Sequence, residues 1–223
     1  ELVIDKVAAS ELASRYGTPL YVYAANGFRG NYDRISKAFA SLKPQICYAL
    51  KACGNIHILR ELVSRGAGLD VVSGGELERA WLSGVDMSKV VFAGVGKTEL
   101  ELRAALSGKH SLLGASAKNM NGQGASDRAS VGLFNIESEG EILRLATLAE
   151  ELGVKAQACL RINPDVDAHT HAYTTTGKHE NKFGVDLNQA REIFKNAQRH
   201  THLSLSGLHV HLGSPIATPK PYE

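Results

Sequence analysis

The stretch Ile46–Asn55, ICYALKACGN, places a lysine directly after a short apolar run. The run has the length and residue types of a buried parallel strand, so Gln45–Leu50 is predicted to be a strand. Because side chains alternate along a strand, Cys47, Ala49 and Lys51 are expected to share one face, with Lys51 pointing inward at the carboxyl end. A lysine in that place is either a reactive amine or a cation that reaches out to solvent.

Five more apolar runs of similar length follow this strand, separated by amphipathic segments. This alternation is typical of an α/β protein with a parallel sheet. Joined by right-handed crossovers, the strands would form either an open doubly wound sheet or a (β/α)8 barrel of the TIM type, of which about six βα units would be present. The predicted strands are Gln45–Leu50, Gly68–Val72, Lys89–Ala93, Val131–Ile136, Lys155–Ile162 and Leu203–His211.

Helix boundaries are marked at both ends. Three segments fit the capping box, in which a Ser or Thr side chain and a Glu three residues later each satisfy the other's free backbone amide. Glycines stand where a left-handed residue would end a helix. The capping pairs are Ser73 with Glu76, Thr98 with Glu101 and Ser138 with Glu141, and the glycines are Gly66, Gly84, Gly108 and Gly153.

Two segments depart from this rhythm. Ser111–Ser130 is small, polar and Gly-rich, and we expect a loop between a helix and the next strand, on the barrel face opposite an active site. Asn163–Asn181 follows a strand directly, so we expect it on the functional face, where it could contact substrate or form a lid.

The composition is that of an ordinary globular chain of 223 residues, of which 43% are hydrophobic. Its 25 basic and 23 acidic residues leave a formal charge of +2, which argues against a nucleic-acid or membrane-surface partner and favours a small molecule. The three cysteines, Cys47, Cys53 and Cys159, suit reduced thiols in a cytoplasmic protein. No apolar run approaches the ~18 residues of a membrane span, and the start lacks a secretory-signal pattern. Because the first residue is not Met, we expect residues before Glu1.

Lys51 allows two interpretations. A desolvated lysine loses its proton more readily, which frees the amine to form a Schiff base with an aldehyde such as pyridoxal phosphate. Alternatively, Lys51 simply extends from the strand end into solvent, which on this segment alone is the simpler interpretation.

The histidines of GLHVHLGS raise a similar choice. His209 and His211 would share a strand face and could bind a metal, or one ring could stack on a flat cofactor. Barrel hydrolases with a His-x-His pair carry it on the first strand, whereas this pair lies on the last strand visible, which disfavours metal. His169 and His171 lie in a polar loop, where a solvated pair is expected. Gly94–Thr98, GVGKT, lacks the spacing of a P-loop, so nucleotide binding is not predicted.

Four further positions are candidates for the site. Gly213-Ser214 would form a turn able to contact a phosphate. Arg161 and Asp70 lie at or near strand carboxyl ends, where catalytic groups of a barrel collect, although either could belong to a structural ion pair. For Glu76, the capping role is a sufficient explanation.

Eight short motifs occur in order along the chain: YGTPLYVY, YALKA, GLDVVSGGE, FAGVGKT, FNIESEGE, LRINP, ENKFG and GLHVHLGS. Together they resemble the diaminopimelate decarboxylase family of pyridoxal-phosphate enzymes, which have the alanine-racemase type of barrel. The resemblance covers most of the chain outside Ser111–Ser130. It implies a carboxy-lyase that converts meso-2,6-diaminopimelate to L-lysine, the last step of lysine biosynthesis, and it favours the reactive-amine interpretation of Lys51.

The resemblance also implies roles for individual residues. Lys51 matches the catalytic lysine that holds pyridoxal 5'-phosphate covalently, His211 the histidine that stacks on its ring, and Ser214 the serine that contacts its phosphate. Arg161 and Asp70 match polar residues that line the cofactor site. No metal is implied.

At the level of the chain, the resemblance implies that residues 1–30 form an N-terminal segment that packs with a C-terminal β domain, and that residues 31–223 form an incomplete cofactor-binding barrel. It also implies a homodimer, and it puts an acidic residue where Glu76 stands. Cys53 departs from the family, which often has Asn there, and we expect no loss of activity from this change.

The β domain, a later Gly-rich phosphate loop and an acidic residue facing the pyridine nitrogen are absent from these 223 residues. We therefore expect a fragment that is inactive alone. Three alternatives remain: a related pyridoxal-phosphate decarboxylase acting on ornithine, arginine or carboxynorspermidine; a catalytically silent barrel that binds a protein partner; and a small single-domain carrier of the cofactor. The presence of both Lys51 and His211 argues against the silent barrel, and a count of six strands argues against the carrier, which needs a closed barrel.

Overall fold

The computed structural model describes residues 1–108, 121–122, 129–163, 183–214, 216 and 218–222. The predictions for Ser111–Ser130 and Asn163–Asn181, and those for His169 and His171, therefore lie largely or wholly outside the described residues.

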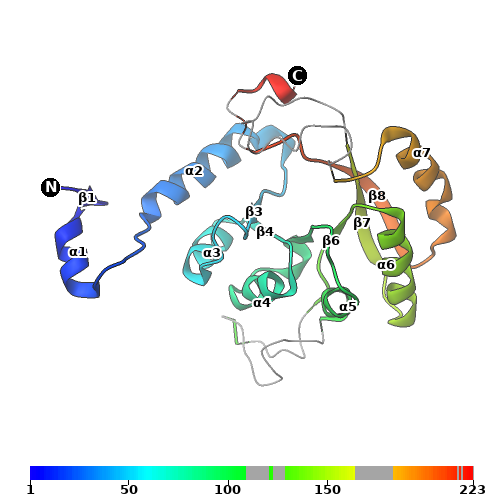
Figure 1. Cartoon of the computed structure of the whole chain (residues 1–223), viewed down its shortest axis with the longest axis horizontal. Helices are drawn as coiled ribbons and strands as arrows, with labels where there is room; N and C mark the ends of the chain where they lie inside the picture. Colours follow the sequence, from blue (N-terminus) through cyan, green and yellow to red (C-terminus); the bar gives the residue numbers. More distant parts are fainter. Residues whose placement is uncertain (109–120, 123–128, 164–182, 215, 217, 223) are drawn as a thin grey trace.

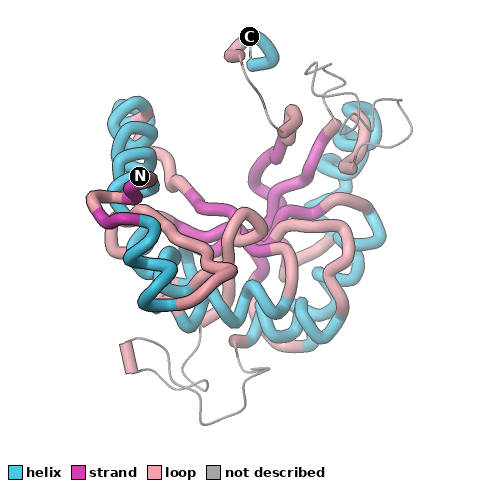
Figure 2. Tube along the Cα trace, turned by 60° about the vertical axis from the view of Figure 1, so that its left-hand side comes forward, coloured by secondary structure: helices cyan, strands magenta, loops and turns pink. Residues whose placement is uncertain are grey.

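Six parallel strands form one sheet in which every spatial neighbour is also the neighbour in sequence. A doubly wound sheet reverses its strand order at one point, whereas this order runs without reversal from β3 to β8. The sheet curves as part of a TIM-type barrel (Figure 2), and all six predicted strands are confirmed. The strands are β3 (Cys47–Ala49), β4 (Gly68–Val71), β5 (Val90–Phe92), β6 (Leu133–Ile136), β7 (Ala156–Ile162) and β8 (Leu203–Val210).

Helices cover the outer face of the sheet (Figure 1). The main core lies between the two layers, where Phe92 and Phe134 have no exposed surface and their ring centroids are 6.3 Å apart. Each of these helices packs one apolar stripe against the sheet; α3, for example, buries Ile58, Leu59 and Leu62. The helices are α3 (Ile56–Val63), α4 (Gly74–Leu82), α5 (Glu99–Ser107), α6 (Glu139–Glu151) and α7 (Leu187–Asn196). Short 3-10 turns are η1 (Ala40–Leu42), η2 (Met87–Lys89), η4 (Ala197–Arg199) and η5 (Lys220–Tyr222).

The helix boundaries agree with the sequence, but only one predicted capping box is complete. Thr98 and Glu101 satisfy each other's amides at the start of α5. At α4, the Glu76 carboxylate accepts instead from the amide of Val72, one residue before the cap, at 2.8 Å. The Glu141 carboxylate of α6 likewise reaches an amide one residue before its cap. The boxes predicted at α4 and α6 are therefore wrong in this detail. The backbone amide one residue before each cap also needs a hydrogen-bond acceptor, and the glutamate supplies it. The predicted stop glycines, Gly66, Gly84, Gly108 and Gly153, all have positive φ.

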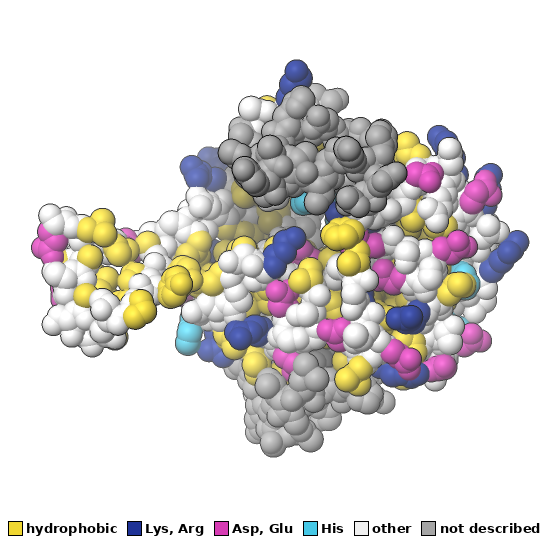
Figure 3. All heavy atoms as spheres, viewed as in Figure 1, with side chains coloured by type: hydrophobic (Ala, Val, Ile, Leu, Met, Phe, Trp, Pro, Cys, Tyr) yellow, Lys and Arg dark blue, Asp and Glu magenta, His cyan; other side chains and the backbone are white. Residues whose placement is uncertain are grey.

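The N-terminal part extends away from the sheet (Figure 1, Figure 3). It comprises a short hairpin of β1 (Val3–Ile4) and β2 (Val7–Ala8), followed by α1 (Ala9–Tyr16), which buries no side chain. The next helix, α2 (Ala25–Ala38), packs against α3. The ion pair of Arg29 with Glu61 joins these two helices, and Asp33 of α2 pairs with Arg65 in the turn after α3. Among the described residues, no helix is long and apolar enough to cross a membrane.

Candidate active site

The predicted polar residues of β4 and β7 lie on the inner face of the sheet. Leu69 and Val71 are fully buried against the helices, so alternation turns Asp70 inward. Arg161 turns inward for the same reason, because the residues on either side of it are buried. In the register of β7 and β8, Arg161 lies directly opposite His209. The inner carboxyl edge of the sheet therefore carries an acid, a cation and an imidazole.

Lys51 lies in the turn just after β3, at the same edge. The preceding Leu50 is buried in the core under the helices, which leaves Lys51 on the inner side. However, Lys51 is exposed, so the expectation that burial activates its amine is wrong for this structure. Strand β3 forms one edge of the sheet, and the described residues leave its inner end uncovered.

Asp70 has an unused acceptor close to Lys51. Its Oδ1 is buried and has no hydrogen-bond partner among the described residues. Burial raises the pKa of Asp70 above its usual range, while the nearby charge of Lys51 partly opposes this shift and Glu76 adds to it. An acidic group in this state accepts a hydrogen bond from any donor brought into the site.

His209, half-buried in β8, and His211, exposed just after this strand, share this environment. Burial lowers the pKa of His209 and of His211, and the Arg161 charge lowers both further, so both rings are neutral near pH 7. The charge of Lys51 also lowers the pKa of His211, which places the two side chains close together. Nδ1 of His209 is buried without a partner in the described part of the chain. No group of three metal-binding side chains occurs among the described residues.

The remaining predicted residues differ in how closely they join this cluster. Ser214 is exposed in the loop after β8 and follows Gly213, whose φ of 146° favours glycine. No described contact links Ser214 to the cluster. The Glu76 carboxylate accepts from the amide of Val72 at 2.8 Å, one residue before the position that a capping box requires.

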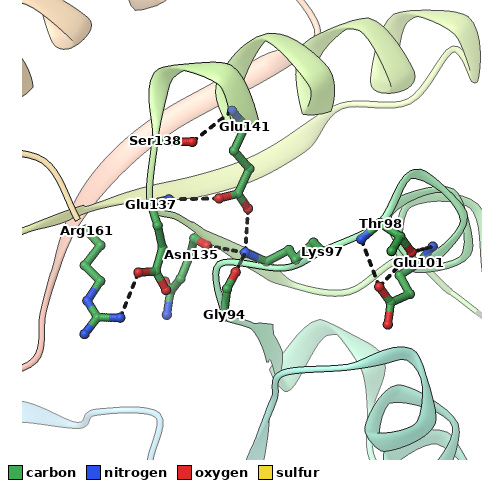
Figure 4. A network of polar contacts seen from close by, with 9 residues as sticks. All are labelled: Gly94, Lys97, Thr98, Glu101, Asn135, Glu137, Ser138, Glu141 and Arg161. Carbon is green, nitrogen blue, oxygen red and sulfur yellow. Dashed lines mark hydrogen bonds and ion pairs between the residues drawn. The ribbon is translucent and has the colours of Figure 1, made fainter. Parts of the chain in front are cut away.

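Lys97, in the GVGKT motif, has a structural role that the sequence did not reveal. Its side chain is 1% exposed, and Nζ donates to the carbonyls of Gly94 at 2.6 Å and Asn135 at 2.7 Å and to Oε1 of Glu141 at 2.5 Å (Figure 4). An ammonium has three donors, and all three are used. The ammonium also lies 5.7 Å from the ring centroid of Phe92.

The sequence allowed Arg161 to belong to a structural ion pair, and the structure shows this pair with Glu137, a partner that the sequence did not identify. Oε2 of Glu137 accepts from Nη1 of Arg161 at 2.8 Å, and these side chains are 4% and 14% exposed. The guanidinium lies 5.5 Å from the ring centroid of Phe183. The sequence signal was weak, because Glu137 stands just before the helix cap Ser138, where an acidic residue is common.

Comparisons with known proteins give this cluster its context. The sequence model of the family described as "Pyridoxal-dependent decarboxylase, pyridoxal binding domain" matches residues 27–223. The chain belongs to this family. Pyridoxal phosphate is therefore the cofactor of the barrel, as the sequence predicted.

Two relatives and one solved structure that the chain resembles carry the same name. The diaminopimelate decarboxylases of Pseudomonas aeruginosa and Aquifex aeolicus are each 40% identical to the chain, over 222 and 223 residues, which is 100% of this chain and 48% of each relative. The crystal structure of diaminopimelate decarboxylase from Helicobacter pylori complexed with L-lysine matches with a TM-score of 0.82 and 35% identity, covering 96% of this chain and 49% of that one. The chain thus spans about half the length of the relatives it matches.

The residues at the carboxyl edge fit pyridoxal phosphate. The unpartnered Asp70 Oδ1 and His209 Nδ1 are polar atoms that a polar ligand could engage. Lys51 supplies an accessible primary amine, His211 a neutral flat ring and Arg161 a positive charge for an anionic group.

Proposed function

We propose that this chain is the cofactor-binding barrel of a diaminopimelate decarboxylase, which releases carbon dioxide from meso-2,6-diaminopimelate to form L-lysine. The names of the relatives support this substrate. One observation carries the chemistry: an accessible amine, Lys51, lies at the carboxyl edge of the barrel beside Asp70 and His211. Active sites of barrels of this type form at that edge.

Each residue has a distinct task in the proposed reaction. When bound, pyridoxal phosphate supplies the electron sink for the pair left by the departing carboxylate. Lys51 would hold it through Nζ, and His211, neutral and flat, would support it by stacking. Arg161 would face an anionic group, and Ser214 would donate a hydrogen bond to the phosphate.

Proton handling falls to the same residues. With cofactor and substrate bound, Nζ of Lys51 would be the amine available to hold a proton for the reacting carbon. Asp70 lies within the field of Lys51, whose charge lowers the pKa of that carboxyl against the larger, opposite effect of burial. The neutral histidines add no competing positive charge near pH 7.

The proposal is tested by trapping the bound cofactor. The protein is incubated with pyridoxal phosphate, reduced with borohydride and mapped by mass spectrometry. We expect one pyridoxyl adduct on Lys51, its loss in Lys51→Ala and its retention in Lys195→Ala, which removes a lysine that is 69% exposed. An adduct spread over surface lysines would refute the site and would favour the catalytically silent barrel.

Substrate identity needs a separate measurement. A related decarboxylase acting on ornithine, arginine or carboxynorspermidine remains the second candidate. Carbon dioxide release by the protein with its full natural chain, measured on a panel of these substrates, is expected to be fastest with meso-2,6-diaminopimelate. Faster turnover of any other substrate on the panel would replace our proposal.

We also propose that residues 1–30 pack with a β domain, that residues 31–223 form the barrel domain, and that the full protein is a cytoplasmic homodimer. The exposed apolar side chains of the N-terminal part support a packing role for it; they include Leu2, Val3, Tyr16, Leu20 and Tyr21. Light scattering of the full natural chain tests the dimer, and a monomer mass would overturn it.

A further inference from the structure

The Glu137–Arg161 ion pair has little access to water, because its side chains are only 4% and 14% exposed. Removing two charges from water carries a cost that their attraction only roughly offsets, so stability alone is a weak reason for such a pair. A buried pair of this kind is better suited to fixing one charged group in one geometry. Arg161, at the carboxyl edge, is the group that such fixing would affect.

Arg161 is held from several sides. Oε2 of Glu137 accepts a hydrogen bond from Nη1 of Arg161 at 2.8 Å, and the guanidinium carbon lies 5.5 Å from the ring centroid of Phe183. The charge of Arg161 lowers the pKa of both His209 and His211, so the guanidinium lies close to the two rings at the end of β8. The position of the Arg161 guanidinium therefore determines the electrostatic field at the carboxyl edge of the sheet, where the cofactor would bind.

Glu137 is itself anchored by a buried cation (Figure 4). Its backbone amide donates to Oε2 of Glu141 at 3.0 Å, and the other oxygen of Glu141 accepts from Nζ of Lys97. The same ammonium binds the carbonyls of Gly94 and Asn135, which lie before α5 and in β6. The turn that carries Glu137 is thus tied through Glu141 and Lys97 to the loop before α5, which supports its carboxylate.

We propose that Glu137 is a positioning residue that holds the Arg161 guanidinium toward an anionic group of the cofactor or the substrate, an inference that rests on the proposed function. Glu137 does not touch the ligand and acts through Arg161. Removing its charge would release the guanidinium, which would then approach the ligand in several orientations and bind it more weakly.

The test is a double-mutant cycle on pyridoxal-phosphate affinity, measured by absorbance titration of the cofactor-free protein with its full natural chain. Glu137→Gln and Arg161→Gln are each expected to weaken binding by about tenfold. Because Glu137 acts through Arg161, the double variant is expected to bind as well as Arg161→Gln alone. Glu151→Gln, which removes an exposed carboxylate that pairs with Arg103 at 2.6 Å, is the matched control and is expected to change nothing.

A second readout uses the cofactor-free protein alone. The Nε–H group of Arg161 is expected to be rigid by ¹⁵N relaxation in the natural chain and in Glu151→Gln, and mobile in Glu137→Gln. If Glu137→Gln shows no cooperative thermal transition, Glu137→Asp replaces it, because a carboxylate one methylene shorter must move or release Arg161. Weaker affinity with a mobile Arg161 supports the proposal in either variant.

Three results would overturn the proposal: an affinity of the Glu137 variant within about twofold of the natural chain, a double variant about tenfold weaker than Arg161→Gln, or an unchanged Arg161 signal. A failure of the proposed function looks different. In that case the natural chain itself forms no adduct on Lys51.

Discussion

Lys97 shows at the scale of one residue what an enclosed cation requires. Its ammonium is removed from water and has three acceptors among the described residues, Gly94 O, Asn135 O and the Glu141 carboxylate, one for each donor. Lys97→Met would keep most of the side-chain volume and leave all three acceptors without their partner. We expect a loss of roughly 3–5 kcal/mol in the free energy of unfolding, measured by urea denaturation. Lys195→Met, in an exposed pair, is the control and should change stability by less than about 0.5 kcal/mol.

His209 gives a prediction for pH. Its folded-state pKa lies below the ordinary value of about 6.5, chiefly because of burial and then because of Arg161, while Glu137 opposes the shift. The unfolded chain then binds more protons than the folded one just below pH 6.5, so this group costs stability as the pH falls through that window. As the pH falls from about 7 to about 5, the free energy of unfolding of His209→Gln should therefore rise relative to that of the natural chain. The same series with His57→Gln, which changes an exposed histidine of α3, is the control for the loss of any histidine.

Sequence reasoning located these side chains more reliably than it described their surroundings. The sequence placed Arg161 near the carboxyl end of one strand and His209 on another, and the structure turns both side chains inward, because a strand has a fixed period of two. It left open whether Lys51 is buried or extends into solvent, and it could not foresee that Lys97 is buried. The acceptors of Lys97 lie as far as 38 and 44 residues away in the sequence, and burial depends on which distant segments meet.

At the scale of elements, close approach of two backbones determines where β6 begins. The strand was predicted from Val131 but starts at Leu133, because Gly132 donates to the carbonyls of Met87 and Val90. Apolar runs and stop glycines are local signals, so they predicted both ends of every described strand of the barrel sheet to within two residues. Which amide a capping carboxylate reaches depends on the neighbouring turn, and two of three were misassigned.

Gly132 yields a prediction for this contact. A Cβ there would lie 1.9 Å from the carbonyl oxygen of Ser88, so the backbone must shift. We expect Gly132→Ala to lower the free energy of unfolding by about 3 kcal/mol, measured by chemical denaturation. Gly140→Ala is the matched control in α6, where a Cβ meets nothing within 4 Å, and it should raise stability by roughly 0.5 kcal/mol. Equal effects of the two changes would contradict the steric argument.

At the scale of the whole molecule, the described sheet has two free edges. Strands β3 and β8 each pair with one neighbour only, as expected from a count of six strands. On the outer face of β8, Leu208 and Val210 are 58% and 42% exposed. A long strand with unpaired backbone groups and apolar side chains is a template for pairing with another chain.

This geometry predicts how a protein made of only these 223 residues would behave. We expect it to self-associate with rising concentration, as followed by light scattering, through the free edge of β8. Leu208→Lys places a charge on that edge and should suppress the association, because the introduced lysine would have to be desolvated when another chain pairs with β8. Leu143→Lys is the matched control, since Leu143 is 53% exposed but lies on helix α6, away from any strand edge. If both substitutions reduce scattering equally, general surface charge is the cause, whereas a selective effect of Leu208→Lys assigns the association to the strand edge.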